Sequence, residues 1–371
     1  MPYFRPIDEL HGTTVIMEGK ERIMIGSNNY LGLSHHPKVI EAAIDAIHRY
    51  GTSCTGSRYL NGTLELHIEL EDRLARFVGK EAALVFSTGF QTNLGWISSL
   101  CGRDDIMLSD SENHASIVDG TRLSFGKCFK YRHGDLSDLE EKLQRFSGKG
   151  LVILTDGVFS MTGEIVELPP VVKLAEKYNA KVFVDDAHAI GVIGERGRGT
   201  GEYWDINEKV DLVMGTFSKS FASLGGFIAG PEDVITYIKC HARPFIFSAS
   251  MPPPSVAATL AALEIMETDT SLLEKLWKNA RKMNEGLSSL GFQVGKTKTP
   301  VVPVTIGDDV TTFRFVNRLY EEGVFANAVV APAVPEGCSS VRTSYMATHT
   351  DELLDRVLEI FKKLGSEFHL I

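Results

Sequence analysis

The chain has 371 residues, of which 43% are apolar and 23% are charged, as in an ordinary globular protein. This length exceeds that of a typical single domain, so at least two domains are expected. The formal net charge of −10 at pH 7 argues against a nucleic-acid-binding protein, which would normally carry a basic surface.

The five cysteines are scattered along the chain, odd in number and without a C-x-x-C spacing. They therefore indicate reduced thiols in a cytoplasmic protein rather than a disulfide framework or a zinc site. The N-terminus shows no signal-peptide pattern, and no apolar run is long enough to cross a bilayer. We therefore expect a cytoplasmic protein without a transmembrane segment.

Residues 1–36 are predicted to form an N-terminal arm and short strands, because residues 14–25 alternate in polarity as a strand does. The loop that follows contains Asn28, Asn29 and Tyr30. Such carboxamides suit a turn, but they also suit the polar head of a substrate, and their spacing does not decide between the two.

Residues 37–254 are predicted to form a large α/β domain. Apolar strand patterns alternate with helical stretches between Ala82 and Ala229, which predicts a mostly parallel central sheet with helices on both faces. Ligands of such sheets bind at the carboxyl ends of the strands. The chemically interesting residues of this chain follow those ends.

The first such strand end leads into a small polar loop with Gly89 and Phe90, where a helix is expected to begin. The unpaired backbone N–H groups and the positive end of a helix form an anion site, although the pattern is common in α/β proteins. His114 follows the next strand. An isolated histidine there is more often a cap or a core residue, but its ring could also stack on a cofactor.

A further apolar strand ends in Asp185 and Asp186, with His188 two residues later. Carboxylates and a histidine together suit several divalent metal ions, and they also suit a solvated strand end. A third interpretation depends on the lysine described next.

Lys219 lies in a short polar loop between two apolar runs. Desolvation lowers the pKa of a lysine, and a neutral amine attacks a carbonyl to form a Schiff base. A reactive lysine and a carboxylate at one sheet edge are what pyridoxal phosphate requires, since the carboxylate keeps the pyridinium nitrogen protonated. We therefore predict pyridoxal 5'-phosphate as the cofactor and no metal site.

Residues 255–371 are predicted to form a smaller C-terminal α+β domain. Three consecutive prolines, residues 252–254, end the large domain, and Ser255 is well placed to cap the next helix. Arg342 lies near the start of an otherwise apolar strand. Either a structural ion pair or a bidentate contact with a substrate carboxylate would account for it.

Six motifs in this order resemble those of the α-oxoamine synthases, and they cover nearly the whole chain. They are residues 28–33, Gly89-Phe90, residues 113–116, residues 185–188, residues 216–220 and Arg342 with His349-Thr350. Members of this family are fold-type I pyridoxal-phosphate enzymes that condense an amino acid with an acyl-CoA. Residues 3–7, 56–63, 86–95 and 331–335 are most similar to the bacterial serine palmitoyltransferases.

The resemblance implies a catalytic role for each of several residues. Lys219 would hold the cofactor as a Schiff base and act as base on the substrate Cα proton. Asp185 would keep the pyridinium protonated, and His114 would stack on the ring and position the substrate carboxylate. His188 would donate a hydrogen bond to the 3-oxygen of the cofactor, with Ser160 close to the same ring edge.

The resemblance also implies binding roles and a dimer. The backbone N–H groups of Gly89 and Phe90 are implied to bind the phosphate together with Thr216, and Ser218 is implied to contact the cofactor. Ser248 would reach the phosphate from a second subunit, which makes the enzyme a homodimer with active sites at the subunit interface. Arg342 and Asn29 would contact the substrate.

The implied reaction joins L-serine to palmitoyl-CoA and releases CoA and CO₂, giving 3-ketodihydrosphingosine in the first step of sphingolipid synthesis. Three alternatives share part of this pattern. They are another α-oxoamine synthase (glycine C-acetyltransferase or 8-amino-7-oxononanoate synthase), a fold-type I aminotransferase or aldolase, and a cofactor-binding protein without catalysis.

Overall fold

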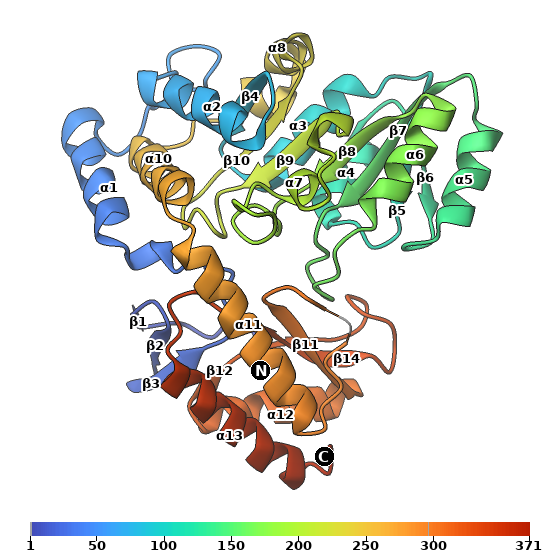
Figure 1. The fold of residues 1–371 in the computed structure, drawn as a ribbon. Helices are drawn as coiled ribbons and strands as arrows, with labels where there is room; N and C mark the ends of the chain where they lie inside the picture. The colour runs from blue at the N-terminus through green and yellow to red at the C-terminus, as the bar shows by residue number, and fades with distance from the viewer. Residues whose placement is uncertain (1, 296) are drawn as a thin grey trace. The chain divides into compact units, whose positions relative to one another are not determined.

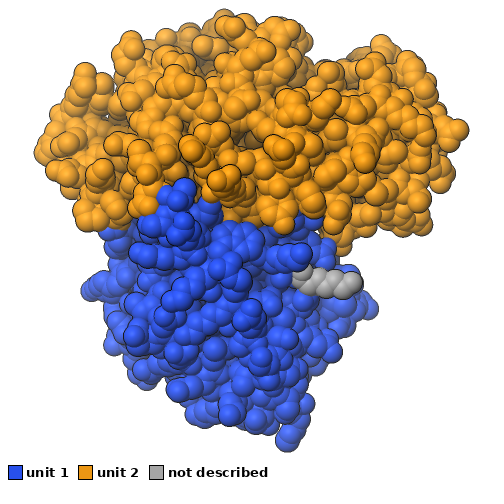
Figure 2. Space-filling model, in the orientation of Figure 1, with its two compact units in different colours: residues 1–35, 160–165, 270–371 blue, residues 36–159, 166–269 orange. Residues whose placement is uncertain are grey.

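The computed structural model describes residues 2–295 and 297–371, and the chain divides into two compact units (Figures 1 and 2). The smaller unit contains Met1–His35, Ser160–Ile165 and Thr270–Ile371, and the larger one contains His36–Phe159 and Val166–Asp269. The domains predicted as 1–36, 37–254 and 255–371 stay a prediction. The compact units place the N-terminal segment with the C-terminal one.

The larger unit is built on a seven-stranded sheet in the order β4-β10-β9-β8-β7-β5-β6. The strands are β4 (Ala82–Phe86), β5 (Asp105–Asp110), β6 (Lys127–Tyr131), β7 (Gly150–Asp156), β8 (Lys181–Asp185), β9 (Leu212–Thr216) and β10 (Gly226–Gly230). The pairs from β6 to β9 are parallel, whereas β10 is antiparallel to both of its neighbours. The predicted mostly parallel central sheet is confirmed.

Helices cover both faces of this sheet (Figure 1). On β8, Val182 and Val184 belong to the core cluster on the face covered by α6 (Leu168–Tyr178), to which α5 (Leu136–Arg145) also contributes. Phe183, between them, packs on the other face against α3 (Gly89–Leu100). Since both faces are buried, the strand is apolar at successive positions rather than at alternate ones.

The remaining helices of the larger unit are α1 (Pro37–Tyr50), α2 (Glu65–Val78), α4 (Ala115–Leu123), α7 (Thr200–Tyr203), the 3₁₀ turn η2 (Asn207–Lys209), α8 (Glu232–His241), α9 (Arg243–Ile246) and α10 (Pro253–Thr268). The expectation that Ser255 caps a helix is wrong, because α10 already begins at Pro253. A proline suits the first helical turn, since its φ is preset and its missing N–H has no partner there.

The smaller unit contains two sheets. One has the order β1-β2-β3-β12 and the other β11-β14-β13. Their strands are β1 (Glu9–Leu10), β2 (Thr14–Met17), β3 (Lys20–Met24), β11 (Val301–Gly307), β12 (Val324–Phe325), β13 (Asn327–Val329) and β14 (Ser339–Ser344). The helices are η1 (Leu33–His35), α11 (Ser271–Ser289), α12 (Asp309–Glu321) and α13 (Asp351–Glu367). The predicted small α+β domain is confirmed.

The two ends of the chain fold together in the smaller unit because they share one sheet. Strand β12 pairs in parallel with β3. The buried Arg22 on β3 stacks its guanidinium 3.7 Å from the ring centroid of Tyr320, and its Nε donates to the Tyr320 carbonyl at 3.1 Å. The N-terminal segment is therefore part of this core rather than a loose arm. Over the described residues, no helix has both the length and the apolar character that a bilayer crossing requires.

Candidate active site

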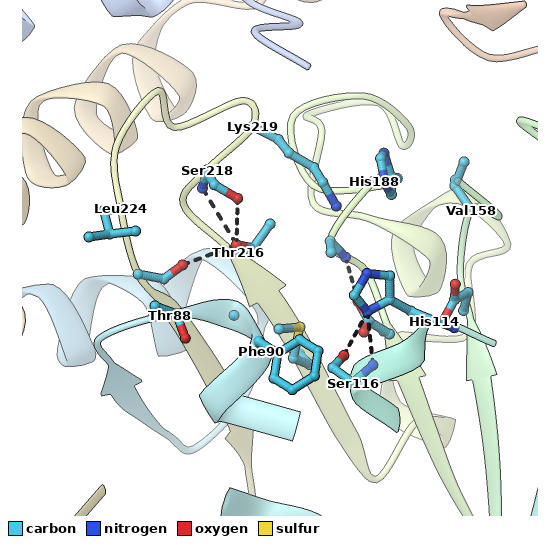
Figure 3. A pocket seen from close by; sticks show the side chains of 16 residues that line it. Thr88, Phe90, His114, Ser116, Val158, His188, Thr216, Ser218, Lys219 and Leu224 are labelled. Carbon is cyan, nitrogen blue, oxygen red and sulfur yellow. Dashed lines mark hydrogen bonds between the residues drawn. The ribbon is translucent and has the colours of Figure 1, made fainter. Parts of the chain in front are cut away.

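The carboxyl ends of β7, β8 and β9 and the start of α3 surround a cavity of about 280 Å³ in the larger unit (Figure 3). Most of the residues singled out in the sequence line this cavity. They are Gly89, Phe90, His114, Asp185, His188, Thr216, Ser218 and Lys219. Parallel strands bring these residues together because their carboxyl ends meet at one edge of the sheet.

Lys219 is held in a closed loop between β9 and β10. The Phe217 N–H donates to the Gly225 carbonyl at 2.9 Å, and the Ser223 N–H donates back to Phe217 at 2.8 Å. The rings of Phe217 and Phe221 are fully buried and anchor the loop. Figure 3 shows the lysine side chain extending from this loop into the cavity.

Asp185 ends β8 with only 4% of its surface exposed. Its Oδ2 accepts a hydrogen bond from Asn93 Nδ2 at 2.7 Å, and its Oδ1 accepts the Ala187 N–H at 3.0 Å. N–H donors of this kind stabilise the charged form of a carboxylate. Two residues further along, His188 lines the same cavity and is itself mostly buried.

His114 lies at the N-terminal end of α4, where its Nδ1 accepts the Ser116 N–H at 3.2 Å. The same nitrogen lies 2.7 Å from Ser116 Oγ. Burial, with a further contribution from the positive charge of Lys219, lowers the pKa of His114, and Asp185 opposes this. The imidazole is therefore neutral at pH 7 and lines the cavity beside the Phe90 ring (Figure 3).

The start of α3 approaches the end of β9 closely and leaves donor groups facing the cavity. A Cβ on Gly89 would lie 2.7 Å from Thr216 Oγ1, so only glycine allows the helix to approach β9 this closely. Thr216 Oγ1 in turn lies 3.1 Å from Ser218 Oγ. Hydroxyl groups and the first N–H groups of a helix together suit a phosphate.

Asp156 is a cavity residue that sequence reasoning missed. It ends β7 directly opposite Asp185 of β8. Burial, and then the nearby Asp185 charge, raise the pKa of Asp156 well above its usual range. The available signal was an acid at the end of the neighbouring strand in a sheet whose other ends carried the predicted site. Over the described residues, no group of three or more His, Cys, Asp or Glu side chains could hold a metal ion.

Four predicted residues lie outside this cavity. Ser248 belongs to the larger unit, where its Oγ accepts a hydrogen bond from Gln91 Nε2 at 3.2 Å. Ser160, Asn29 and Arg342 belong to the smaller unit. Asn29 Nδ2 donates to Ser34 Oγ at 2.8 Å.

Arg342 lies on β14 and is 6% exposed. Its Nε donates to the Ser160 carbonyl at 2.7 Å, and its Nη2 donates to Asn28 Oδ1 at 3.0 Å. No carboxylate within residues 2–295 and 297–371 forms an ion pair with it. The structural ion pair that the sequence left open is therefore not formed within the described chain, and the guanidinium charge is held by neutral oxygens.

Comparisons with known proteins agree with this geometry. The family model of aminotransferase class I and II matches residues 20–361. The serine palmitoyltransferase of Bacteriovorax stolpii is 52% identical over 99% of this chain and 88% of its own. The 8-amino-7-oxononanoate synthase of Thermoanaerobacter pseudethanolicus is 45% identical over 97% of this chain and 92% of its own. A high-resolution structure of a serine palmitoyltransferase with its pyridoxal phosphate internal aldimine has a TM-score of 0.98 and 35% identity, covering 100% of this chain and 94% of its own.

Proposed function

Because the chain belongs to the aminotransferase class I and II family, and within it to the α-oxoamine synthases, we propose that it condenses L-serine with a long-chain acyl-CoA. It is an acyltransferase-type enzyme, and its cofactor is pyridoxal phosphate. With palmitoyl-CoA the products are 3-ketodihydrosphingosine, CoA and CO₂, which is the first step of sphingolipid synthesis. The observation that carries the proposal is the single cavity that contains Lys219, Asp185 and Gly89.

The chemistry divides between the cofactor and the chain. Bound pyridoxal phosphate supplies an electron sink for the carbanion at the substrate Cα. Lys219 Nζ holds the cofactor and later removes the Cα proton, as its position at the cavity supports. Asp185, held as an acceptor by two N–H donors, keeps the ring nitrogen protonated. His114 would stack on the ring.

The remaining site residues bind and orient. His188 would donate to the 3-oxygen, and Thr216 with the N–H groups of Gly89 and Phe90 would bind the phosphate, with Ser218 also in contact with the cofactor. A place for Ser160 near the same ring edge stays a prediction. The position of Ser248, outside the cavity of its own chain, suits a contribution to the site of a second subunit in a homodimer. A cytoplasmic location stays a prediction.

Arg342 is proposed to bind the serine carboxylate, with Asn29 contacting the polar groups of the substrate. The support is a buried guanidinium that neutral oxygens hold and no acid neutralises within the described residues. A substrate carboxylate would supply the counter-charge of the guanidinium. Such charge-assisted hydrogen bonds are roughly twice as strong as neutral ones.

The test is an assay of CoA release over a grid of amino acids (serine, glycine and alanine) and thioesters (acetyl-, pimeloyl- and palmitoyl-CoA). We expect serine with palmitoyl-CoA to give the highest kcat/KM, since each buried CH₂ contributes about 0.8 kcal/mol to binding. The apolar, proline-rich residues 330–335 would form part of the contact with the acyl chain at little entropic cost.

The relative at 45% identity makes another α-oxoamine synthase the second candidate. A preference for alanine with pimeloyl-CoA, or for glycine with acetyl-CoA, would replace serine and palmitoyl-CoA as substrates and leave the family assignment intact. Amino transfer without CoA release would contradict the acyltransferase itself.

A further inference from the structure

Asn93 is a fully buried polar residue directly behind the cavity, and none of the proposed steps uses it. It lies on α3, in the second turn of the helix. Its Nδ2 donates to Asp185 Oδ2 at 2.7 Å and to Ser116 Oγ at 2.8 Å, and its Oδ1 accepts from Trp96 Nε1 at 3.1 Å. One carboxamide therefore contacts both the acid and the helix end that carries His114.

The orientation of this amide follows from Trp96. An indole N–H can only donate a hydrogen bond, so the group that faces it must be the amide oxygen. The indole is 1% exposed and packs on Phe183 with ring centroids 4.2 Å apart, which fixes its own position. The amide nitrogen of Asn93 must then face Asp185 and Ser116, and a flipped amide would leave two buried groups without suitable partners.

The direction of the next hydrogen bond follows in the same way. Ser116 Oγ accepts from Asn93, so its own hydrogen is available for His114 Nδ1 at 2.7 Å. The Ser116 backbone N–H, which cannot accept, also points at Nδ1 at 3.2 Å (Figure 3). Because both neighbours donate to Nδ1, this nitrogen carries no proton, and the single ring proton of the neutral imidazole is on Nε2.

We propose that Asn93 is a positioning residue that sets the donor and acceptor roles in the cavity, holding Asp185 as an acceptor and His114 as an Nε2–H donor. The identity of the group that receives the Nε2–H rests on the proposed function, in which it is the substrate carboxylate. An Nε2 lone pair in that place would repel the carboxylate. We call the hydrogen bonds that link Trp96, Asn93, Ser116 and His114 the Asn93 network.

The experiment uses the full-length holoenzyme labelled with [¹⁵N]histidine and no amino acid or thioester. Two-bond ¹H–¹⁵N correlation spectra report the tautomer of each imidazole, and a His114→Gln protein identifies the His114 signals. The variants are Asn93→Leu, which keeps the branched shape but removes all three hydrogen bonds, and Trp96→Phe, which removes the N–H that orients the amide. Asn279→Leu is the matched control, because Asn279 is also buried and its Nδ2 also donates two hydrogen bonds, in the smaller unit.

We expect the wild type and Asn279→Leu to show His114 as the Nε2–H tautomer. In Asn93→Leu, Ser116 Oγ becomes available as an acceptor while the Ser116 N–H still donates to Nδ1, so an Nδ1-protonated form of His114 should become detectable as a minor population beside the Nε2–H form. The dissociation constant for pyridoxal phosphate should rise about 10- to 100-fold, as expected for a lost hydrogen bond to a charged group. Trp96→Phe should give the same minor form to a smaller extent.

A wild-type His114 spectrum and an unchanged cofactor affinity in Asn93→Leu would overturn the proposal. Should Asn93→Leu fail to fold, the spectrum of Trp96→Phe is the test. A wild-type His114 spectrum in that variant would overturn the proposed role of the Asn93 network. The measurement contains no amino acid or thioester, so a wild-type enzyme that releases no CoA would refute the proposed function and leave the tautomer result standing.

Discussion

Two kinds of buried charge occur in this molecule, and they differ in what completes them. Arg58 and Glu71 form a closed pair, since both side chains are buried and two parallel hydrogen bonds of 2.8 and 2.9 Å join them. Asp185 and Arg342 are equally buried, but only neutral groups hold them. No described residue forms an ion pair with either one.

We propose that this difference separates a structural charge from one that binds a ligand. A buried charge without a counter-charge is costly, because water no longer solvates it and neutral dipoles compensate only in part. We infer that ligands complete these two open charges. The pyridinium would face Asp185, and the substrate carboxylate would face Arg342.

The largest effect is expected from Asp185→Asn. The neutral amide keeps the shape but no longer stabilises a protonated ring nitrogen, and its NH₂ or oxygen must face the Asn93 and Ala187 donors. Turnover should fall on the order of 10²-fold or more, as for other lost electrostatic contributions. The rate of CoA release and the cofactor dissociation constant, measured by absorbance, check this.

Asp105→Asn is the control for that substitution. Asp105 is the first residue of β5, at the amino end of the strand and so away from the cavity at the carboxyl ends, and its side chain accepts the Gly102 N–H at 2.8 Å. The control substitution should leave turnover within twofold or so of the wild type. Near-normal turnover of Asp185→Asn would contradict the open-charge interpretation and leave Asp185 as a structural acceptor of the Asn93 and Ala187 hydrogen bonds.

A smaller effect is expected from Arg342→Lys, which keeps the charge but loses the planar donor geometry. Lysine cannot make both the Ser160 and Asn28 contacts and still present two donors to a carboxylate. The KM for serine should rise roughly tenfold, equivalent to about 1.4 kcal/mol, with a smaller change in the KM for the thioester. An unchanged KM for serine would indicate that the carboxylate binds elsewhere.

The smallest effect on catalysis, but a clear effect on stability, is expected from protonating two buried histidines, His67 and His349, whose ring nitrogens all have hydrogen-bond partners. In each, one ring nitrogen accepts a backbone N–H and the other donates to a carbonyl: His67 contacts Leu64 and Met251, and His349 contacts Met346 and Met24. Burial lowers the pKa of both from 6.5 to about 4. Their neutral forms are therefore part of the fold.

The sign of the pH dependence follows from these values. Between pH 6.5 and about 4 the unfolded chain binds protons that the folded chain does not, so stability is complete above pH 6.5 and falls as the pH decreases. Between pH 7.5 and 5.5 each histidine should reduce the free energy of unfolding by about 1 kcal/mol. Urea unfolding of the wild type and of His349→Gln at both pH values measures this, and the variant should show a shallower dependence. If the free energy of unfolding changed equally with pH in the wild type and in His349→Gln, the assignment of part of this pH dependence to His349 would be contradicted.

The sequence predicted several of the reactive side chains that line the cavity, but not the residues that support them. Lys219, Asp185 and His114 could be found because each has a reactive side chain at a recognisable strand end. Asn93 and Trp96 could not, because they lie in the middle of a helix whose pattern is also that of an ordinary core helix. Their role depends on which side chain of another strand lies opposite, and that is a property of the tertiary structure.

The fold was predictable to a similar degree and for similar reasons. The apolar strands of the larger unit are continuous, so their number and mostly parallel arrangement could be inferred. The grouping of the N-terminal segment with residues 270–371 could not, because the parallel pairing of β3 with β12 joins residues some three hundred positions apart. The start of α10 was misplaced by three residues, since the N-cap is Pro252 rather than Ser255 and consecutive prolines can both end one element and begin another.

The antiparallel strand β10 has a consequence for engineering the chain. The loop that carries Lys219 leaves the sheet on β9 and returns to it immediately on β10, where Gly226 pairs with Thr216. The loop that presents the Lys219 amine is thus fixed at both ends by neighbouring strands of one sheet. Insertions or a new pair of termini within residues 217–225 would leave every active-site residue present and still misplace the amine. Circular permutation of this enzyme therefore has to begin in a loop away from that edge of the sheet.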